Sequence, residues 1–210
     1  MRPAPRVFRM QQALEHLRMA DPVLGALIDR IGPYAIELRE PDFETLTRAI
    51  VLQQLSGKVA DVIFARLVAA CGNGRLTPEG VLRRRAATLR ACGLSQQKIN
   101  YIRELARMVR DGSLDLGALR EMPDDEVYRV LTGIKGIGRW TVQMFLMFAL
   151  GRPDVLPSAD LGIQAAIRNV YNLPERPKPA EVDEYGAKWR PYCSVASWYL
   201  WRSLETKAGL

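Results

Sequence analysis

The sequence holds few of the residues that metal sites and nucleophile triads need. It has one histidine, His16, and three cysteines, Cys71, Cys92 and Cys193, which lie far apart and form no CxxC pair. Neither a Cys/His zinc site nor a Ser–His triad can be assembled from this set. The odd cysteine count leaves at least one thiol unpaired, and we expect buried thiols in a reducing compartment. Any chemistry must therefore use carboxylates, hydroxyls, amides or lysines.

Long apolar runs are also missing. No stretch approaches the ~18 uninterrupted apolar residues of a membrane span, so we expect no membrane contact. The opening residues, MRPAPRVFRM, are basic without the apolar core of a secretory signal, and we expect a cytoplasmic protein. The hydrophobic fraction of 48 % is ordinary for a globular chain and favours a folded protein over a disordered one. The 210 residues suffice for one large domain or two small lobes.

Positive charge, by contrast, is in excess. Lysine and arginine number 30 against 23 aspartates and glutamates, and the net charge is +7. A basic domain favours a polyanionic partner, with nucleic acid first among them. The charge alone is a weak indication, because many basic proteins bind no nucleic acid.

Helical periodicity runs through almost the whole chain, and no convincing alternation of strands interrupts it. The sequence therefore predicts an all-α protein. Ser95 and Gly112 bound one capped helix, Gly93 ends another, and Ser56 is expected to cap a third. We expect a helical run over residues 43–71 that is broken at 56–58. Further helices are expected over residues 81–93, 95–112, 123–133, 140–150, 161–171 and 182–207, and a Pro-rich loop over 172–181.

A glycine hairpin, LTGIKGIGRW at residues 131–140, separates two of these helices. Gly136 and Gly138 can adopt backbone angles closed to other residues, and they let the backbone approach another molecule. The helix that follows presents free N–H groups at its N-terminus, where an anion is favoured. The alternative is a tight helix–helix turn that needs glycine only for steric reasons.

The order of residues in the hairpin favours the phosphate interpretation. An apolar residue, Lys, Gly, an apolar residue, Gly and a basic residue follow one another, and this order resembles the helix-hairpin-helix motif that grips the DNA backbone. The isoleucines would anchor the hairpin in the core, while the basic residues add charge at its rim. The expected contacts to the DNA backbone are Ile134, Lys135, Gly136, Ile137, Gly138 and Arg139.

An aspartate follows 22 residues after the last hairpin glycine. Asp160 ends the turn LPSAD and precedes the helical run LGIQAAIRNVY, so it should lie at a helix N-terminus. The helix dipole stabilises a negative charge at that position. A simple helix cap is the alternative, because aspartate is a common capping residue.

Hairpin and aspartate together resemble the helix-hairpin-helix superfamily of DNA base-excision glycosylases. The stretch RAIVLQQLSGKVAD at residues 48–61 is similar to the segment with which that family penetrates the duplex. Trp140 and the stretch SVASWYLW at residues 194–201 resemble the 3-methyladenine DNA glycosylase II branch. The resemblance covers about residues 40–205.

The resemblance implies a fold and a domain plan. The fold is a two-lobed helical bundle with the active site in the cleft between the lobes. Residues 41–210 would form one glycosylase domain, with a division into two helical subdomains left open, and residues 1–40 would complete the helical fold.

The resemblance also implies a reaction. The enzyme would flip a damaged nucleotide out of double-stranded DNA and hydrolyse its N-glycosidic bond, with Asp160 as the catalytic carboxylate. Relatives that also cut the strand carry a lysine where this chain has Trp140, so a monofunctional glycosylase without β-lyase activity is implied.

Aromatic residues suit an alkylated purine, which carries positive charge. Trp140 and Trp201 are expected in the substrate pocket, while Trp198 is expected in the core. Met144 stands where some relatives place an aromatic residue. Gln53, Gln54 and Leu55 match the segment that fills the gap left by the flipped nucleotide, with Gln54 or Leu55 favoured. The alternative for these three is a polar helix end with Leu55 in the core.

We expect no cofactor, and we expect a monomer because the hairpin needs only one copy, with the oligomeric state left open. Family members with an iron–sulfur cluster hold it with four closely spaced cysteines, and Cys193 stands alone in that part of this chain. A monovalent cation held by hairpin carbonyls is left open. Two other functions are also left open: a glycosylase of the same fold for another lesion, and a non-catalytic DNA-binding module.

Overall fold

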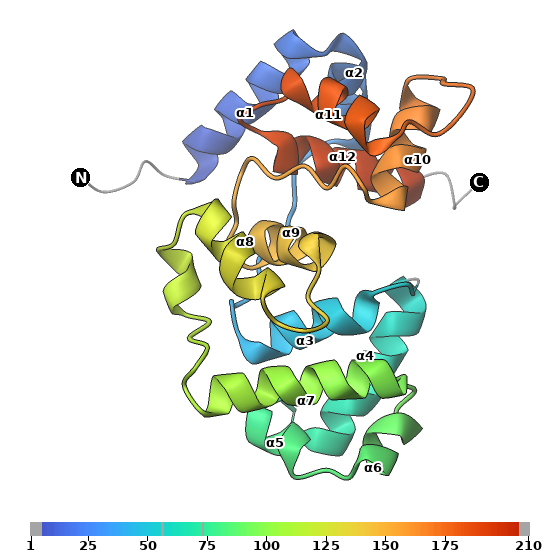
Figure 1. The fold of residues 1–210 in the computed structure, drawn as a ribbon. Coiled ribbons are helices and arrows are strands. Elements are labelled where there is room, and N and C mark those ends of the chain that lie inside the picture. The colour runs from blue at the N-terminus through green and yellow to red at the C-terminus, as the bar shows by residue number, and fades with distance from the viewer. Residues whose placement is uncertain (1–5, 56, 73, 206–210) are drawn as a thin grey trace. The chain divides into compact units, whose positions relative to one another are not determined.

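The protein is built from helices and loops (Figure 1). The computed structural model describes residues 6–55, 57–72 and 74–205, and these ranges contain no β-strand, which confirms the predicted all-α class. The chain divides into two compact units. Unit 1 combines residues 1–37 with 151–210, and unit 2 holds residues 38–150.

Unit 2 is organised around α3. This helix packs against both α7 and α9, and its apolar face buries Leu46, Ile50 and Val51. The unit contains α3 (Phe43–Leu52), α4 (Gly57–Cys71), α5 (Pro78–Leu82), α6 (Ala86–Ala91), α7 (Gln96–Arg110), the 3-10 helix η1 (Ala118–Arg120), α8 (Asp124–Thr132) and α9 (Arg139–Phe148).

Unit 1 is formed by helices from the N-terminal and C-terminal parts of the chain, and it is organised around α12. This helix packs against α10 and α2, and the core between them includes the fully buried Trp189 and Tyr199. The unit contains α1 (Arg6–Ala20), α2 (Pro22–Ile31), α10 (Leu161–Val170), α11 (Pro179–Ala187) and α12 (Cys193–Glu205). None of the described helices of either unit is both long and apolar enough to cross a membrane.

Most predicted helices are confirmed. Ser95 caps α7 by accepting the N–H of Lys98, and Gly112 follows the helix with a φ of +75°. The expected break after α3 is present, although Ser56 lies outside the described residues. The expected burial of the thiols of Cys71, Cys92 and Cys193 is confirmed.

Two predicted helices are wrong, because each is divided in two. The run 81–93 forms the end of α5 and then α6, because Arg85 between them has a non-helical ψ of 150°. The run 182–207 is split into α11 and α12 at Pro191, which lacks the N–H that an uninterrupted helix needs.

Candidate active site and DNA-binding hairpin

The glycine hairpin is a tight turn between α8 and α9. The N–H of Ile137 bonds the carbonyl of Ile134 at 3.0 Å, and both isoleucines are buried as predicted. Gly136 has a φ of +92°, and a Cβ atom there would lie 2.1 Å from the ring of Tyr101 on α7. Glycine is therefore required at this position both by the backbone angle and by the close approach of the ring.

The backbone conformation of Gly138 differs from the one predicted. Its φ of −91° and ψ of 173° are extended angles that any residue adopts, so the expectation of a special backbone angle at this glycine is wrong. Gly138 is the N-cap of α9, and it has no side chain that could cap the first N–H groups of that helix. These N–H groups are the ones that an anion would contact.

The rim of the hairpin is basic. Lys135 and Arg139 are exposed, and the guanidinium carbon of Arg139 lies 4.7 Å from the centre of the Tyr128 ring. The ring holds the arginine beside the N-terminus of α9, where positive charge adds to the helix dipole.

The segment Gln53–Leu55 lies next to this hairpin in unit 2. The amide of Gln53 donates to the carbonyl of Gly136 at 2.8 Å and to the hydroxyl of Thr141 at 2.9 Å. Gln54 is exposed with a φ of +59°, and Leu55 is 37 % exposed. Gln53 therefore binds the loop to the hairpin, whereas Gln54 and Leu55 extend from it. The alternative that places Leu55 in the core is wrong.

Asp160 is the N-cap of α10, as predicted. Its Oδ1 atom accepts the N–H of Ile163 at 2.9 Å and the indole N–H of Trp201 at 3.0 Å, and the carboxylate is half-buried. A Cβ atom on Gly162 would lie 2.9 Å from this oxygen and 3.1 Å from the indole nitrogen. Glycine at position 162 thus leaves room for the contact between the acid and Trp201.

The loop that leads to Asp160 is attached to α12 at its other end. The hydroxyl of Ser194 donates to the carbonyl of Arg152 at 2.7 Å and accepts the N–H of Val155 at 3.0 Å. Near the end of the loop, the Gln164 amide donates to the carbonyl of Ser158 at 3.1 Å. Since Trp201 also lies on α12, one helix fixes both the course of the loop and the orientation of its aspartate.

The remaining aromatic positions differ in their surroundings. Trp140 and Met144 lie four residues apart on α9 in unit 2, and both are half-buried. In unit 1, the ring of Trp198 packs edge-on against Tyr34 and Tyr199, each with ring centres 4.9 Å apart. Trp201 is half-buried, and its bond to Asp160 gives it an orienting contact that the sequence did not indicate.

A comparison with protein families settles the family of this chain. Residues 47–191 match the family described as HhH-GPD superfamily base excision DNA repair protein. The chain belongs to this superfamily. The resemblance that the hairpin and Asp160 suggested is thereby confirmed.

Several known proteins resemble the chain over most of its length. DNA-3-methyladenine glycosylase 1 of Schizosaccharomyces pombe is 36 % identical, over 94 % of this chain and 89 % of the relative. The putative DNA-3-methyladenine glycosylase YfjP of Bacillus subtilis is 32 % identical, over 98 % and 74 % respectively. The structure of the S. pombe 3-methyladenine DNA glycosylase Mag1 in complex with abasic DNA matches with a TM-score of 0.87 and 35 % identity, over 92 % of this chain and 97 % of that one.

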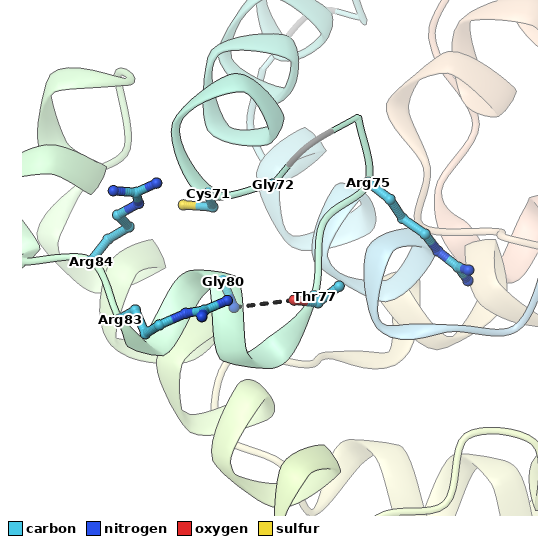
Figure 2. A pocket seen from close by; sticks show the side chains of 7 residues that line it. All are labelled: Cys71, Gly72, Arg75, Thr77, Gly80, Arg83 and Arg84. Atoms are coloured by element: carbon cyan, nitrogen blue, oxygen red, sulfur yellow. Dashed lines mark hydrogen bonds between the residues drawn. The ribbon is translucent and has the colours of Figure 1, made fainter.

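A cavity of about 500 Å³ in unit 2 contains none of the predicted site residues. Figure 2 shows Arg84 beside Cys71, whereas Arg75 points away and pairs with Asp42 at 2.8 Å. Burial raises the pKa of the Cys71 thiol to about 11, so the thiol stays protonated at neutral pH. The lining residues are Cys71, Gly72, Arg75, Thr77, Gly80, Arg83 and Arg84.

Metal-binding groups do not gather in the described ranges. Among residues 6–55, 57–72 and 74–205, no three His, Cys, Asp or Glu side chains lie close enough together to hold a metal ion.

Proposed function

We propose that this HhH-GPD protein is a monofunctional DNA glycosylase that excises alkylated purines of the 3-methyladenine type in base excision repair. The observation that carries the proposal is the carboxylate of Asp160, held at the N-terminus of α10 by the indole of Trp201. Its relatives at 36 % and 32 % identity bear the name DNA-3-methyladenine glycosylase.

The proposed reaction breaks the bond between C1′ of the deoxyribose and the purine nitrogen. The electron pair of that bond leaves with the base, and an alkylated cationic purine thereby departs neutral. The sugar develops oxocarbenium character, which the negative charge of Asp160 stabilises. A water molecule then adds to C1′ and loses its proton, which leaves an abasic site.

DNA binding is assigned to unit 2. The N–H groups at the start of α9, together with Lys135 and Arg139, are proposed to hold a backbone phosphate. Gln54 and Leu55 are proposed to enter the stack when the nucleotide leaves it, since the amide of Gln53 is already bonded to the hairpin. Trp140 offers an aromatic face on which a cationic base can stack, with Met144 beside it on α9.

Strand cleavage is not part of the proposal. A glycosylase with β-lyase activity needs an amine that attacks C1′, and Trp140 occupies the position of that lysine in the relatives that have one. Lys135 lies on the exposed turn of the hairpin, where the proposed role is a phosphate contact. We propose that the protein acts as a monomer in the cytoplasm, on damaged double-stranded DNA, and without a cofactor.

The deciding experiment is base release from methylated DNA, followed by analysis of the strands with and without alkali. We expect free 3-methyladenine, with strand breaks that appear only after alkali treatment. Breaks without alkali would contradict the monofunctional assignment. Tight DNA binding without any base release would favour a different lesion or a binding module.

A further inference from the structure

Lys98, in the first turn of α7, extends to the end of α3. Its ammonium group donates to the carbonyl of Val51 at 2.7 Å and to the carbonyl of Gln53 at 2.8 Å. The last carbonyls of a helix have no partners within the helix, and the helix dipole favours a cation beside them. Lys98 therefore satisfies the C-terminus of α3 at the point where the segment Gln53–Leu55 begins.

The environment of Lys98 is unusual for a lysine. The side chain is half-buried, and this burial lowers the pKa of its ammonium group. No carboxylate in the described part of the chain forms an ion pair with it. A lysine that only served solubility would be exposed. The position of Lys98 therefore indicates that its ammonium group serves to hold the two carbonyls.

The segment after α3 is held from two sides. Lys98 of α7 binds the carbonyl of Gln53, and the side chain of the same Gln53 binds the hairpin at Gly136 and Thr141. Between these attachments and Leu55, Gln54 adopts a φ of +59°, a region that residues other than glycine rarely occupy. Such a conformation persists only where the surrounding contacts fix it.

We propose that Lys98 is a positioning residue that holds Gln54 and Leu55 in the conformation in which they enter the duplex. The inference rests on the proposed glycosylase function. When a base leaves the stack, a residue must fill the gap before the base returns. A segment that is already ordered enters without losing further conformational entropy at that moment. Lys98 acts through the backbone of this segment and not on the glycosidic bond.

If Lys98 positions Gln54 and Leu55, its loss should affect paired and unpaired lesions differently. A lysine that only supported the fold would not have this effect. Filling the gap matters most when the flipped base leaves a paired partner, and least when the lesion is already unpaired. Loss of Lys98 should therefore slow excision from a paired lesion more than excision from an unpaired one. Damage to the fold would slow both equally.

The test uses single-turnover base release by the full chain from two duplexes. One carries an alkylated purine opposite its normal partner, and the other carries the same lesion opposite an abasic analogue. We expect Lys98→Met to slow release from the paired lesion about tenfold and from the unpaired lesion less than about twofold. Lys98→Arg, which keeps the charge and the donors, should restore most of the rate.

Lys58→Met is the matched control. Lys58 is exposed in the first turn of α4, so its loss removes the same charge close to the segment. We expect any effect of Lys58→Met to be equal on the two duplexes. Equal slowing of both duplexes by Lys98→Met, or no slowing, would overturn the inference.

Two further measurements separate failure of the inference from failure of the proposed function. In a Gln54→Ala/Leu55→Ala background, Lys98→Met should add no further loss, whereas additive losses would count against the inference. The fluorescence of 2-aminopurine beside the lesion reports insertion without any base release. If the wild-type protein released no base, the same Lys98→Met comparison by fluorescence would still decide the role of Lys98.

Discussion

Two aspartates of unit 1 have the same local design and different surroundings. Asp21 caps α2 and Asp160 caps α10, and each accepts a hydrogen bond from a tryptophan indole: Trp189 at 2.8 Å and Trp201 at 3.0 Å. Asp21 is 1 % exposed, whereas Asp160 is half-buried. The same cap and the same donor thus occur once in the core and once at a position that water can reach.

The donors around Asp21 explain its position in the core. One oxygen accepts the N–H groups of Val23 and Leu24, while the other accepts the Tyr171 hydroxyl and the Trp189 indole and pairs with Lys188 at 3.0 Å. A buried carboxylate is stable only when such partners replace water. Asp21 therefore joins the start of α2 to the end of α10 and to the segment between α11 and α12.

The comparison shows that a capped and indole-bonded aspartate is not in itself a catalytic feature. Exposure distinguishes the two, because an acid that stabilises a substrate must be reachable by it. Substitutions that conserve shape can test this distinction, since asparagine caps a helix about as well as aspartate does.

The largest expected effect belongs to Asp160→Asn. Loss of the negative charge should lower the rate of base release about a hundredfold to a thousandfold, the range seen when one electrostatic stabiliser is removed. The unfolding free energy should change by less than about 1 kcal/mol, because the cap is kept. Single-turnover base release and urea denaturation measure the two quantities. Base release at the wild-type rate would refute the assigned role.

Asp21→Asn should give the opposite pattern. The asparagine amide would meet the donors of Trp189 and Lys188, so we expect the unfolding free energy to fall by about 2 to 3 kcal/mol. The rate of base release per folded molecule should stay at the wild-type value. Urea denaturation combined with activity well below the transition midpoint checks both. A large loss of activity in the folded variant would mean that exposure does not separate the two aspartates.

The sequence can predict contacts between residues that lie close together along the chain, but not contacts between residues that lie far apart along it. The cap of α10 and the hairpin are local patterns, and the spacing of Asp160 from the hairpin led to the role proposed for it. The bond from Trp201 to Asp160 spans 41 residues, and the bond from Gln53 to Gly136 spans 83. No periodicity indicates such pairs, because they depend on how helices pack.

The hairpin glycines illustrate the same limit. The sequence pattern predicted a special backbone angle at both Gly136 and Gly138, but of the two only Gly136 has a left-handed φ. The ring that demands a glycine at position 136 comes from Tyr101, which is 35 residues away. Steric demands of this kind arise from tertiary packing and leave no local trace in the sequence.

A smaller effect is expected for Trp201→Phe. The substitution keeps an aromatic ring but removes the N–H that orients the Asp160 carboxylate, so base release should slow about tenfold, the equivalent of one hydrogen bond to a charged group. DNA affinity should be unchanged, because the indole is not assigned to the phosphate contacts. A rate equal to that of the wild-type protein would show that the cap alone orients Asp160.

The smallest expected effect is in the acid dependence of stability. Burial raises the pKa of Asp21, but hydrogen bonds from Tyr171, Trp189 and Leu24 and the contact with Lys188 outweigh it and leave the pKa below its ordinary value. A carboxyl group of this kind stabilises the fold at pH values above its unfolded pKa of about 3.9. That contribution is lost as the pH falls through the lower, folded pKa.

The stabilisation that Asp21 gives to the wild-type protein should therefore be constant between pH 7 and pH 5, and the unfolding free energy should fall below about pH 4. Asp21→Asn removes the titrating group, so its free energy of unfolding should fall less steeply in that acid range than that of the wild type. Urea denaturation of both proteins from pH 2 to pH 7 measures the two slopes. If the slopes of the wild type and of Asp21→Asn were equal, Asp21 would not be the acid-sensitive support of unit 1.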